Sequence, residues 1–305
     1  MKIYAAIDAG SNAVRLLVAG VDTGTGGGRL RRLRYERRTT RLAADIERTG
    51  NLSPQSQERT IAALRDFKRT IASYQVTGIR AVGTSAIREA ANGAAFISRV
   101  LNETGLKIEA ISHEEEARLS AMGVTGFLEL PRSFILDIGG GSTEWMITEG
   151  NRLLRSGSVA AGVVKFLFLS GPKIEDRIRA VAKRIKEAVF PLPAGTAFVI
   201  TGGSASTAAS IDLGLASYDH EMLHGHEMTL VRLREIHERL RHMLPDERKA
   251  VPGLEPDRAD LIVPGLGLII DIMEAFGLDR LIASDTGLPE GLVLGLLEEK
   301  EKEKG

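Results

Sequence analysis

The chain has 305 residues, of which 43% are hydrophobic and 26% are charged. These fractions are those of an ordinary globular protein and exclude a disordered chain and a polytopic membrane protein. The length predicts two domains, because single cores tend to split beyond roughly 250–300 residues. The 40 basic and 40 acidic side chains cancel, which excludes a general attraction to nucleic acid or to anionic membranes and makes any anion site a local feature.

The sequence contains no cysteine. Disulfides, thiol nucleophiles and cysteine metal sites are therefore excluded, and the remaining carboxylates, histidines and hydroxyls suit hard-metal chemistry with oxygen ligands. Asp8 interrupts the short apolar stretch at the N-terminus before a signal-peptide core could form. No window approaches the roughly 20 apolar residues of a membrane span, so we expect a cytoplasmic protein.

The first half of the chain predicts strands followed by a mixture of helices and strands. Two apolar runs at 3–8 and 14–21, with only AGSNA between them, predict a β-hairpin. A loose glycine turn at 24–28 leads into a predicted third strand at 29–41, which holds seven arginines and one glutamate. The remaining patterns predict a helix over 53–74, a strand over 78–82, a helix from the following turn to about Thr104, a strand over 107–111 and a helix over 114–124.

The second half begins by repeating this pattern. Residues 133–137, the turn IGGGST and residues 144–149 repeat the opening hairpin, with the leading aspartates, Asp8 and Asp137, 129 positions apart. The later patterns predict a third strand over 151–158, helices over 173–189, 228–243 and 258–276, strands over 197–201 and 280–284, and a charged, solvated helix end at 298–305.

The turns DAGSN at 8–12 and DIGGGST at 137–143 are candidate phosphate sites. A glycine turn with neighbouring hydroxyls can point several backbone N–H groups into one concavity that binds phosphate oxygens. A dinucleotide-binding glycine loop opens a helix, whereas both of these turns open strands, so we exclude that kind of site. Asp8 and Asp137 lead the turns and can hold Mg²⁺ against bound phosphates; the alternative is that they only stabilise the turns.

Three further features each allow two interpretations. TGGSAST at 201–207 opens a helix, and is either an anion site at the helix N-terminus or a plain N-cap by Ser204 or Ser206. The arginines of 29–41 form either a track for a polyanion or a solvated edge strand protected by charge. The histidines of HGH at 224–226 have a spacing suited to a metal, but structural hydrogen bonds explain them better.

Taken as an ordered set, the motifs resemble the exopolyphosphatase and guanosine pentaphosphatase (Ppx/GppA) phosphatase family, in its short form. The matching segments are AAIDAGSNAVRLLVA, VGTSAIREAANG, ISHEEEARLSAMGV, ILDIGGGSTEWMI, HGHEMT, RADLIVPG and SDTGLPEG. The resemblance implies the α/β fold of the actin-like ATPases and sugar kinases: two RNase H-like domains with mixed sheets flanked by helices, and an active site in the interdomain cleft. We expect these domains at 1–122 and 123–287, with the terminal helix 288–305 packing back on the first.

The resemblance also implies an activity. The expected reaction is hydrolysis of the terminal phosphoanhydride of inorganic polyphosphate by water, with Mg²⁺, or Mn²⁺ in its place. Hydrolysis of guanosine pentaphosphate (pppGpp) is the alternative, and a kinase of the same superfold or a catalytically silent sensor are more distant ones. The resemblance is compatible with a homodimer.

Site residues follow by matching motifs. Glu116, immediately before Ala-Arg-Leu, is the implied catalytic glutamate; Arg88 of the TSAxR motif and Glu144 of STE join it, and Asp8, Asp137 and Glu144 are the implied metal ligands. Without the match, Glu116 would be a helix-dipole residue and Arg88 a solvated one. The implied phosphate-binding residues are Gly10, Ser11, Asn12, Arg15, Gly139, Gly140, Gly141, Ser142 and Thr143.

The sequence departs from the family pattern in three places. Pro289 stands where arginine is common, Ser204 stands where threonine is commoner, and the chain ends near 305, without the C-terminal helical region of the long family members. We therefore expect short polyphosphates to be cut better than long ones.

Overall fold

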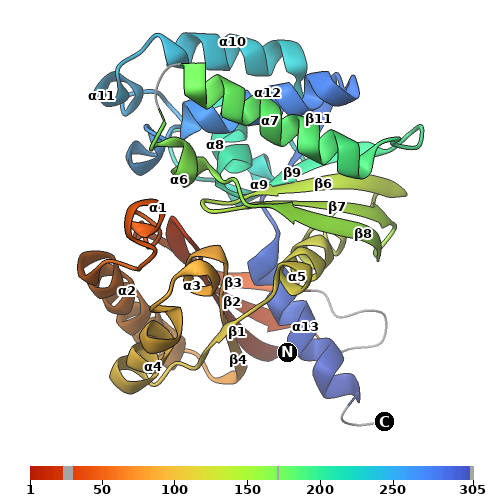
Figure 1. Cartoon of the computed structure of the whole chain (residues 1–305). Coiled ribbons are helices and arrows are strands. Elements are labelled where there is room, and N and C mark those ends of the chain that lie inside the picture. Colours follow the sequence, from red (N-terminus) through yellow and green to blue (C-terminus); the bar gives the residue numbers. More distant parts are fainter. Residues whose placement is uncertain (23–29, 170–171, 303–305) are drawn as a thin grey trace. The chain divides into compact units, whose positions relative to one another are not determined.

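The computed structural model describes residues 1–22, 30–169 and 172–302 (Figure 1). The glycine turn predicted at 24–28 lies outside these residues. The chain divides into two compact units, Met1–Gly123 with Leu288–Gly305, and Val124–Gly287.

The first unit is built on a mixed five-stranded sheet with the order β3-β2-β1-β4-β5. β1, β2 and β3 pair antiparallel, which confirms the predicted hairpin and third strand. β4 joins β1 in parallel and β5 joins β4 in parallel. The strands are β1 Lys2–Ala9, β2 Ala13–Val21, β3 Leu30–Thr39, β4 Val76–Gly83 and β5 Ile108–Ala110.

Helix α2 of the first unit buries one apolar face. α2 begins at Ser53, whose hydroxyl accepts a hydrogen bond from the Ser56 N–H, and Pro54 occupies its first turn. Ile61, Leu64 and Phe67 of α2 pack into the core under the sheet. The helices are α1 Ile46–Thr49, α2 Pro54–Ala72, α3 Ser85–Glu89, α4 Gly93–Thr104, α5 His113–Thr125 and α13 Leu288–Lys302.

The helix predicted to open after the turn GTSAIREAANG and to reach about Thr104 is α4, but that turn also contains the short helix α3, and the chain breaks between the two helices. The Asn92 side chain bonds the backbone of Leu52 on both sides, accepting from its N–H at 2.8 Å and donating to its carbonyl at 2.9 Å. A Cβ on Gly93 would lie 2.0 Å from the Ile87 carbonyl oxygen. Only glycine lets α4 start this close to α3, so the break is fixed by Asn92 and Gly93 together.

The second unit repeats the arrangement of the first. Its six-stranded sheet has the order β10-β11-β9-β6-β7-β8, in which β6, β7 and β8 pair antiparallel while β9 and β11 continue in parallel. This confirms the internal repeat and the predicted α/β architecture of mixed sheets. The strands are β6 Arg132–Ile138, β7 Thr143–Glu149, β8 Arg152–Val159, β9 Ala197–Thr201, β10 Glu227–Thr229 and β11 Arg280–Ser284.

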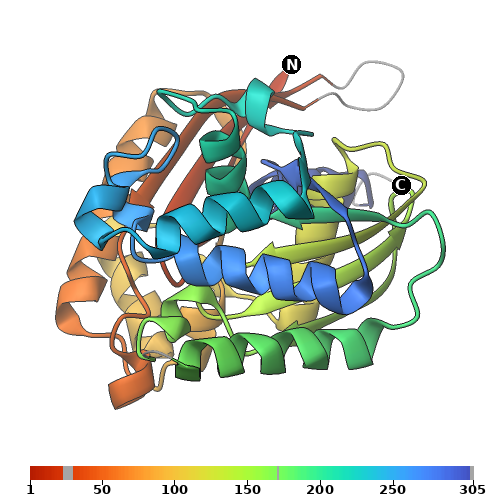
Figure 2. The ribbon, with the colours of Figure 1, turned by 90° about the horizontal axis from the view of Figure 1, so that it is seen from above.

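Helices α7, α12 and α10 lie side by side in one layer over a face of this sheet (Figures 1 and 2). Phe134, Leu136 and Trp145 of the sheet belong to the core beneath them. The helix predicted over 228–243 starts later, because the Thr229 hydroxyl accepts from the Arg232 N–H and caps α10 after β10. The helices are α6 Val163–Phe166, α7 Pro172–Val189, α8 Gly203–Asp212, α9 His220–Leu223, α10 Leu230–Arg241, α11 Pro245–Arg248 and α12 Ile262–Phe276, with a 3₁₀ turn at Pro256–Arg258.

None of the helices in the described parts of the chain is both long enough and apolar enough to cross a membrane.

Candidate active site

The first glycine turn, between β1 and β2, is anchored through its carbonyl groups, which accept hydrogen bonds from the backbone that follows β3. The Gly10 N–H donates to the Ala13 carbonyl at 3.1 Å and closes the turn. The Ser11 carbonyl accepts from the Ala43 N–H at 2.9 Å, and the Asn12 carbonyl accepts from the N–H of Arg41 at 2.8 Å. Because the C=O and N–H of a trans peptide point in opposite directions, anchoring these carbonyls turns the following N–H groups to the other side of the turn.

Several buried polar atoms around this turn have no hydrogen-bond partner among the residues that the structure describes. They are Asp8 Oδ1, Ser11 Oγ, Asn12 Oδ1 and Thr40 Oγ1. Buried polar groups normally find partners, since leaving one unmade costs about 1–3 kcal/mol. Hydroxyls can donate to phosphate oxygens, and carboxylate and amide oxygens can receive a cation or its bound water. The first turn therefore offers several polar atoms that a ligand could bond.

Asp8 and Arg15 lie directly opposite each other on β1 and β2. Arg15 Nη1 donates to Asp8 Oδ2 at 3.1 Å. Burial raises the pKa of Asp8, and the Arg15 charge and hydrogen bond act against that rise. A cation at the free Oδ1 would favour the ionised form in the same sense as Arg15.

Arg37, which sequence reasoning did not single out, lies directly opposite Arg15 across β2 and β3. Like charges at such a cross-strand position repel each other, so an anion held between or beside them relieves the repulsion. Arg37 can be identified from the sequence only when the alternation of side chains along a strand is combined with knowledge of the partner strand.

The arginine-rich strand is not one continuous track. Arg34 Nε and Arg38 Nη2 each donate to the buried Glu36 at 2.9 Å. Arg32 Nη2 lies 2.7 Å from Glu290 of α13 and its guanidinium also stacks on Tyr35. These arginines pair with carboxylates, and β3 lies at the edge of its sheet, as the edge-strand interpretation expects.

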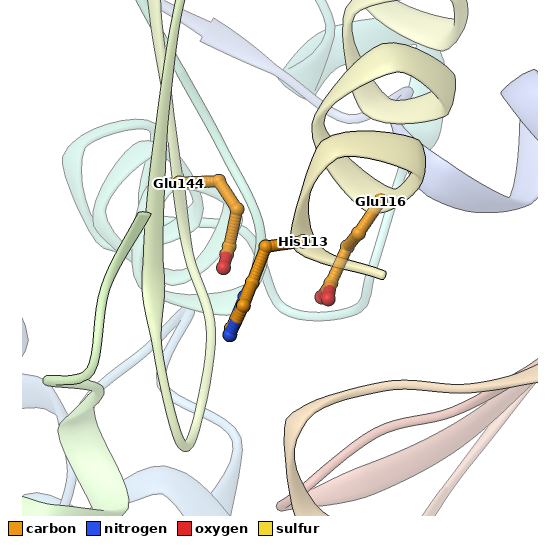
Figure 3. A group of neighbouring side chains, drawn as sticks. All are labelled: His113, Glu116 and Glu144. Carbon is orange, nitrogen blue, oxygen red and sulfur yellow. The ribbon is translucent and has the colours of Figure 1, made fainter. Parts of the chain in front are cut away.

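Helix α5 places Glu116 and His113 around the Arg88 guanidinium. Figure 3 shows both side chains projecting from the first turn of α5. Arg88 Nη1 donates to Glu116 Oε2 at 3.1 Å and to the Ile111 carbonyl at 2.7 Å, and Arg88 Nη2 lies 2.8 Å from His113 Nδ1. Because a guanidinium can only donate, His113 Nδ1 is the acceptor. His113 is a site residue that the sequence motifs did not reveal.

The three adjacent glutamates at the start of α5 have different surroundings. The Glu116 side chain is buried, whereas Glu114 is fully exposed to solvent. Glu115 is held by Arg118, with Nε to Oε2 at 2.8 Å, and by Arg80, with Nη2 to Oε1 at 3.1 Å. Of the three, Glu116 is the one bonded to Arg88.

The second glycine turn, between β6 and β7, is anchored in the same way. The Gly139 carbonyl accepts from the Val163 N–H at 3.0 Å, and the Gly140 carbonyl accepts from the Val164 N–H at 2.9 Å. The Gly139 N–H donates to the Ser142 carbonyl at 3.0 Å. The turn therefore rests on the start of α6, and its remaining N–H groups point away from that helix.

Thr143, which follows this turn, also serves as an anchor. Its hydroxyl donates to the Ala161 carbonyl at 2.6 Å, and the side chain is fully buried.

Two carboxylates face each other where the second unit repeats the Asp8–Arg15 pair. Asp137 lies directly opposite Glu144 across β6 and β7. Glu144 projects from β7 (Figure 3), is buried, and its Oε1 accepts from Ser158 Oγ at 2.8 Å. Facing carboxylates repel each other unless a cation or a proton lies between them. Oxygen donors in this arrangement fit Mg²⁺ or Mn²⁺.

The third candidate, at the start of α8, has no side-chain cap. Gly202 is the N-cap, with φ of 89°, and neither Ser204 nor Ser206 caps the helix, so the capping interpretation is wrong. A Cβ on Gly203 would lie 1.7 Å from Arg258 Nη1, which places the buried Arg258 guanidinium against this helix end. Arg258 Nε donates to Glu255 Oε2 at 2.9 Å, so this guanidinium already pairs with a carboxylate.

The HGH histidines make structural hydrogen bonds, as the second interpretation expects. His226 Nε2 bonds Asp212 Oδ2 at 2.8 Å, and His224 Nδ1 accepts from the Asp285 N–H at 3.3 Å.

Comparison with known proteins gives a consistent result. The model of the Ppx/GppA phosphatase family matches residues 18–300. Exopolyphosphatase 2 of Mycobacterium tuberculosis is 30% identical over 96% of this chain and 98% of its own length. The crystal structure of the Aquifex aeolicus member of the Ppx/GppA family superposes with a TM-score of 0.82 and 28% identity, and covers 98% of both chains. An exopolyphosphatase from Cytophaga hutchinsonii, 22% identical, shares the fold with a TM-score of 0.89 over 98% of both chains.

Proposed function

We propose, from the premise that the chain belongs to the Ppx/GppA phosphatase family, that it hydrolyses the terminal phosphoanhydride of inorganic polyphosphate and releases orthophosphate. Membership of this family makes it a phosphoanhydride hydrolase. The observation that carries the proposal is the shared construction of the two glycine turns, whose carbonyls are anchored from behind. Such turns present N–H groups to an anion that repeats along its length, as a polyphosphate does.

In this proposal, hydrogen-bond donors held in place by the fold stabilise the negative charge of the phosphates. The turns at 10–12 and 139–142 supply backbone N–H groups, and Arg15 with Arg37 supplies two guanidinium groups beside the first turn. Positioning and electrostatics of this kind provide most of the rate enhancement in phosphoryl transfer.

A divalent cation completes this charge balance. In the second unit, Asp137 and Glu144 would hold such an ion, and in the first unit Asp8 is the candidate oxygen donor. When bound, such an ion neutralises phosphate charge and lowers the pKa of coordinated water. The unpartnered Asp8 Oδ1 and the facing Asp137 and Glu144 carboxylates support this assignment.

Glu116 orients and deprotonates the attacking water in this proposal. Its carboxylate is held by Arg88, which in turn bonds His113 and the Ile111 carbonyl. Arg88 therefore keeps Glu116 in one rotamer and offers a guanidinium suited to bidentate contact with a phosphate. A positioned general base of this type contributes about 10²–10⁴-fold to the rate.

The test is Glu116→Gln, with Glu114→Gln as the matched control in the same helical turn. Glutamine keeps an oxygen that accepts from Arg88, so the local structure is retained while the base is lost. We expect kcat for orthophosphate release to fall about 10²–10⁴-fold, with polyphosphate binding by filter retention largely intact. Glu114→Gln is expected to behave as the parent protein. If Glu116→Gln kept the kcat of the parent protein, Glu116 would not be the general base.

The substrate is tested in the same assay. Orthophosphate release from polyphosphates of defined length, from pppGpp and from ATP separates an exopolyphosphatase from a pppGpp hydrolase. Acceptor-dependent ADP formation would identify a kinase, and binding without phosphate release would identify a sensor. We expect short polyphosphates to be the preferred substrates, and a strong preference for chains of hundreds of units would contradict that.

A further inference from the structure

The C-terminal helix α13 lies against α5 in the first unit, with the two backbones in contact (Figure 1). A Cβ on Gly291 would lie 1.8 Å from the Leu119 carbonyl oxygen of α5. One turn later, a Cβ on Gly295 would lie 3.1 Å from Leu119 Cδ2. A side chain at position 291 would therefore force the helices apart, whereas one at position 295 meets two side chains, the end of Leu119 and the Arg80 guanidinium, whose Nη1 would lie 3.2 Å away.

An ion-pair network fastens the same two helices to the sheet. Arg80 of β4 is at its centre, with 12% of its side chain exposed. Its Nη2 lies 3.1 Å from Glu115 of α5, its Nη1 lies 3.4 Å from Glu299 of α13, and its Nε lies 3.7 Å from Glu109 of β5. One guanidinium thus joins two strands and two helices.

A second arginine closes the network. Arg118 of α5 donates to Glu115 from Nε at 2.8 Å, and its Nη1 lies 3.7 Å from Glu298 of α13. The hydrogen bond from Arg118 holds the pKa of Glu115 below its usual value, against the effect of partial burial. Glu115 therefore stays ionised and bound between Arg80 and Arg118.

The opposite end of α13 is also fixed. Glu290, in its first turn, is buried, and Arg32 Nη2 approaches it at 2.7 Å. The helix is held at both ends, with its glycine surface on α5 between them.

We propose that Arg80, acting with α13, positions Glu116 for catalysis. The first turn of α5 is bonded on two sides, by Arg88 at Glu116 and by Arg80 and Arg118 at the adjacent Glu115, and these contacts oppose rotation and sliding of the helix. The inference rests on the proposed role of Glu116. Arg80 is a positioning residue: it is bonded to Glu115 and acts on Glu116 only through the helix that carries both.

The test compares Arg80→Met with Arg99→Met. Arg99 is a matched control because it also joins several carboxylates in the first unit, pairing with Glu58 of α2 and Glu103 of α4, but it does not pair with α5. Since a misplacement of about 1 Å can cost 10²-fold in rate, we expect kcat of Arg80→Met to fall by about 10- to 100-fold with KM changed less than about twofold. Both substitutions are expected to lower the melting temperature by similar amounts, whereas kcat of Arg99→Met is expected to stay unchanged.

Two further readouts separate position from stability. Arg80→Lys retains a cation for Glu115 and is expected to recover most of kcat. Hydrogen exchange of the amides in α5, followed by mass spectrometry, is expected to accelerate in Arg80→Met and not in Arg99→Met. Gly291→Ala should reproduce the loss of kcat, since its added Cβ meets the backbone of α5.

The inference fails if Arg80→Met keeps kcat within about twofold of the parent protein, or if it and Arg99→Met lose activity in parallel with stability. Glu116→Gln distinguishes this failure from that of the proposed function. An inactive Glu116→Gln beside a fully active Arg80→Met overturns the positioning role alone. An active Glu116→Gln overturns the assignment of the base, whatever Arg80→Met does.

Discussion

Gly162 supports the second glycine turn, and replacing it with alanine tests whether that turn binds substrate. The residue is the N-cap of α6, with φ of −122° and ψ of 170°. Alanine adopts this extended conformation without strain, so the backbone angles contribute nothing to the effect. An added Cβ would, however, lie 2.4 Å from the Gly140 carbonyl carbon and 2.5 Å from the Gly141 nitrogen. The only relief is movement of the turn or of the segment that anchors it.

The magnitude follows from this contact. Overpacking against well-ordered atoms costs about 1–3 kcal/mol. If this cost displaces the turn from its phosphate-binding geometry, kcat/KM falls by roughly 5- to 150-fold, at about 1.4 kcal/mol for each factor of ten.

The assay is steady-state release of orthophosphate from short polyphosphate, with the melting temperature measured in parallel. Gly150→Ala is the control: Gly150 lies at the other end of the same strand pair, where φ of 53° makes alanine unfavourable but nothing lies within 4 Å of the added Cβ. We expect Gly150→Ala to lose stability and retain kcat/KM. Equal kcat/KM in the two variants would refute a role for the turn in substrate binding.

Three further predictions concern charge. Arg37→Gln should raise KM by about five- to tenfold, because one of two facing guanidinium groups is lost, whereas Arg34→Gln, which loses only its pairing with Glu36, should leave KM unchanged; equal effects in steady-state kinetics would contradict this. Glu144→Gln should raise the Mg²⁺ concentration for half-maximal rate by about tenfold or more, and an unaltered Mg²⁺ titration would exclude Glu144 as a ligand. Burial lowers the pKa of His237 below the ordinary 6.5, so the unfolded chain binds more protons and stability falls as the pH drops through about 6.5; His237→Gln should flatten this fall in melting temperatures measured between about pH 7.5 and 5.5.

Much of the fold could be predicted from the sequence because its signals are local. Apolar runs predict the two hairpins with their leading aspartates, and capping residues predict the helix that begins at Ser53. The short helix α3, inside the turn that precedes α4, was not predicted, and its separation from α4 depends on Asn92 bonding Leu52, forty positions away.

The candidate site shows the same division between local and distant information. Glu116 and Arg88 were marked by motifs, and their hydrogen bond joins two of the predicted residues. Arg37 was hidden among seven arginines, since the pairing that places it opposite Arg15 is a property of the assembled sheet. Likewise, no sequence pattern shows that Val163 and Val164 hold the carbonyls of the second turn.

The two halves of this repeated fold differ in the residue that lies opposite the leading aspartate, and therefore in the net charge of that cross-strand pair. Asp8 faces an arginine, and its pair is close to neutral, whereas Asp137 faces a glutamate, and its pair carries two negative charges when both are ionised. Under the proposed function, the first hairpin would bind a phosphate group directly, whereas the second would bind one through a cation. The two halves of the repeat would then make chemically different contacts with phosphate groups that are themselves alike.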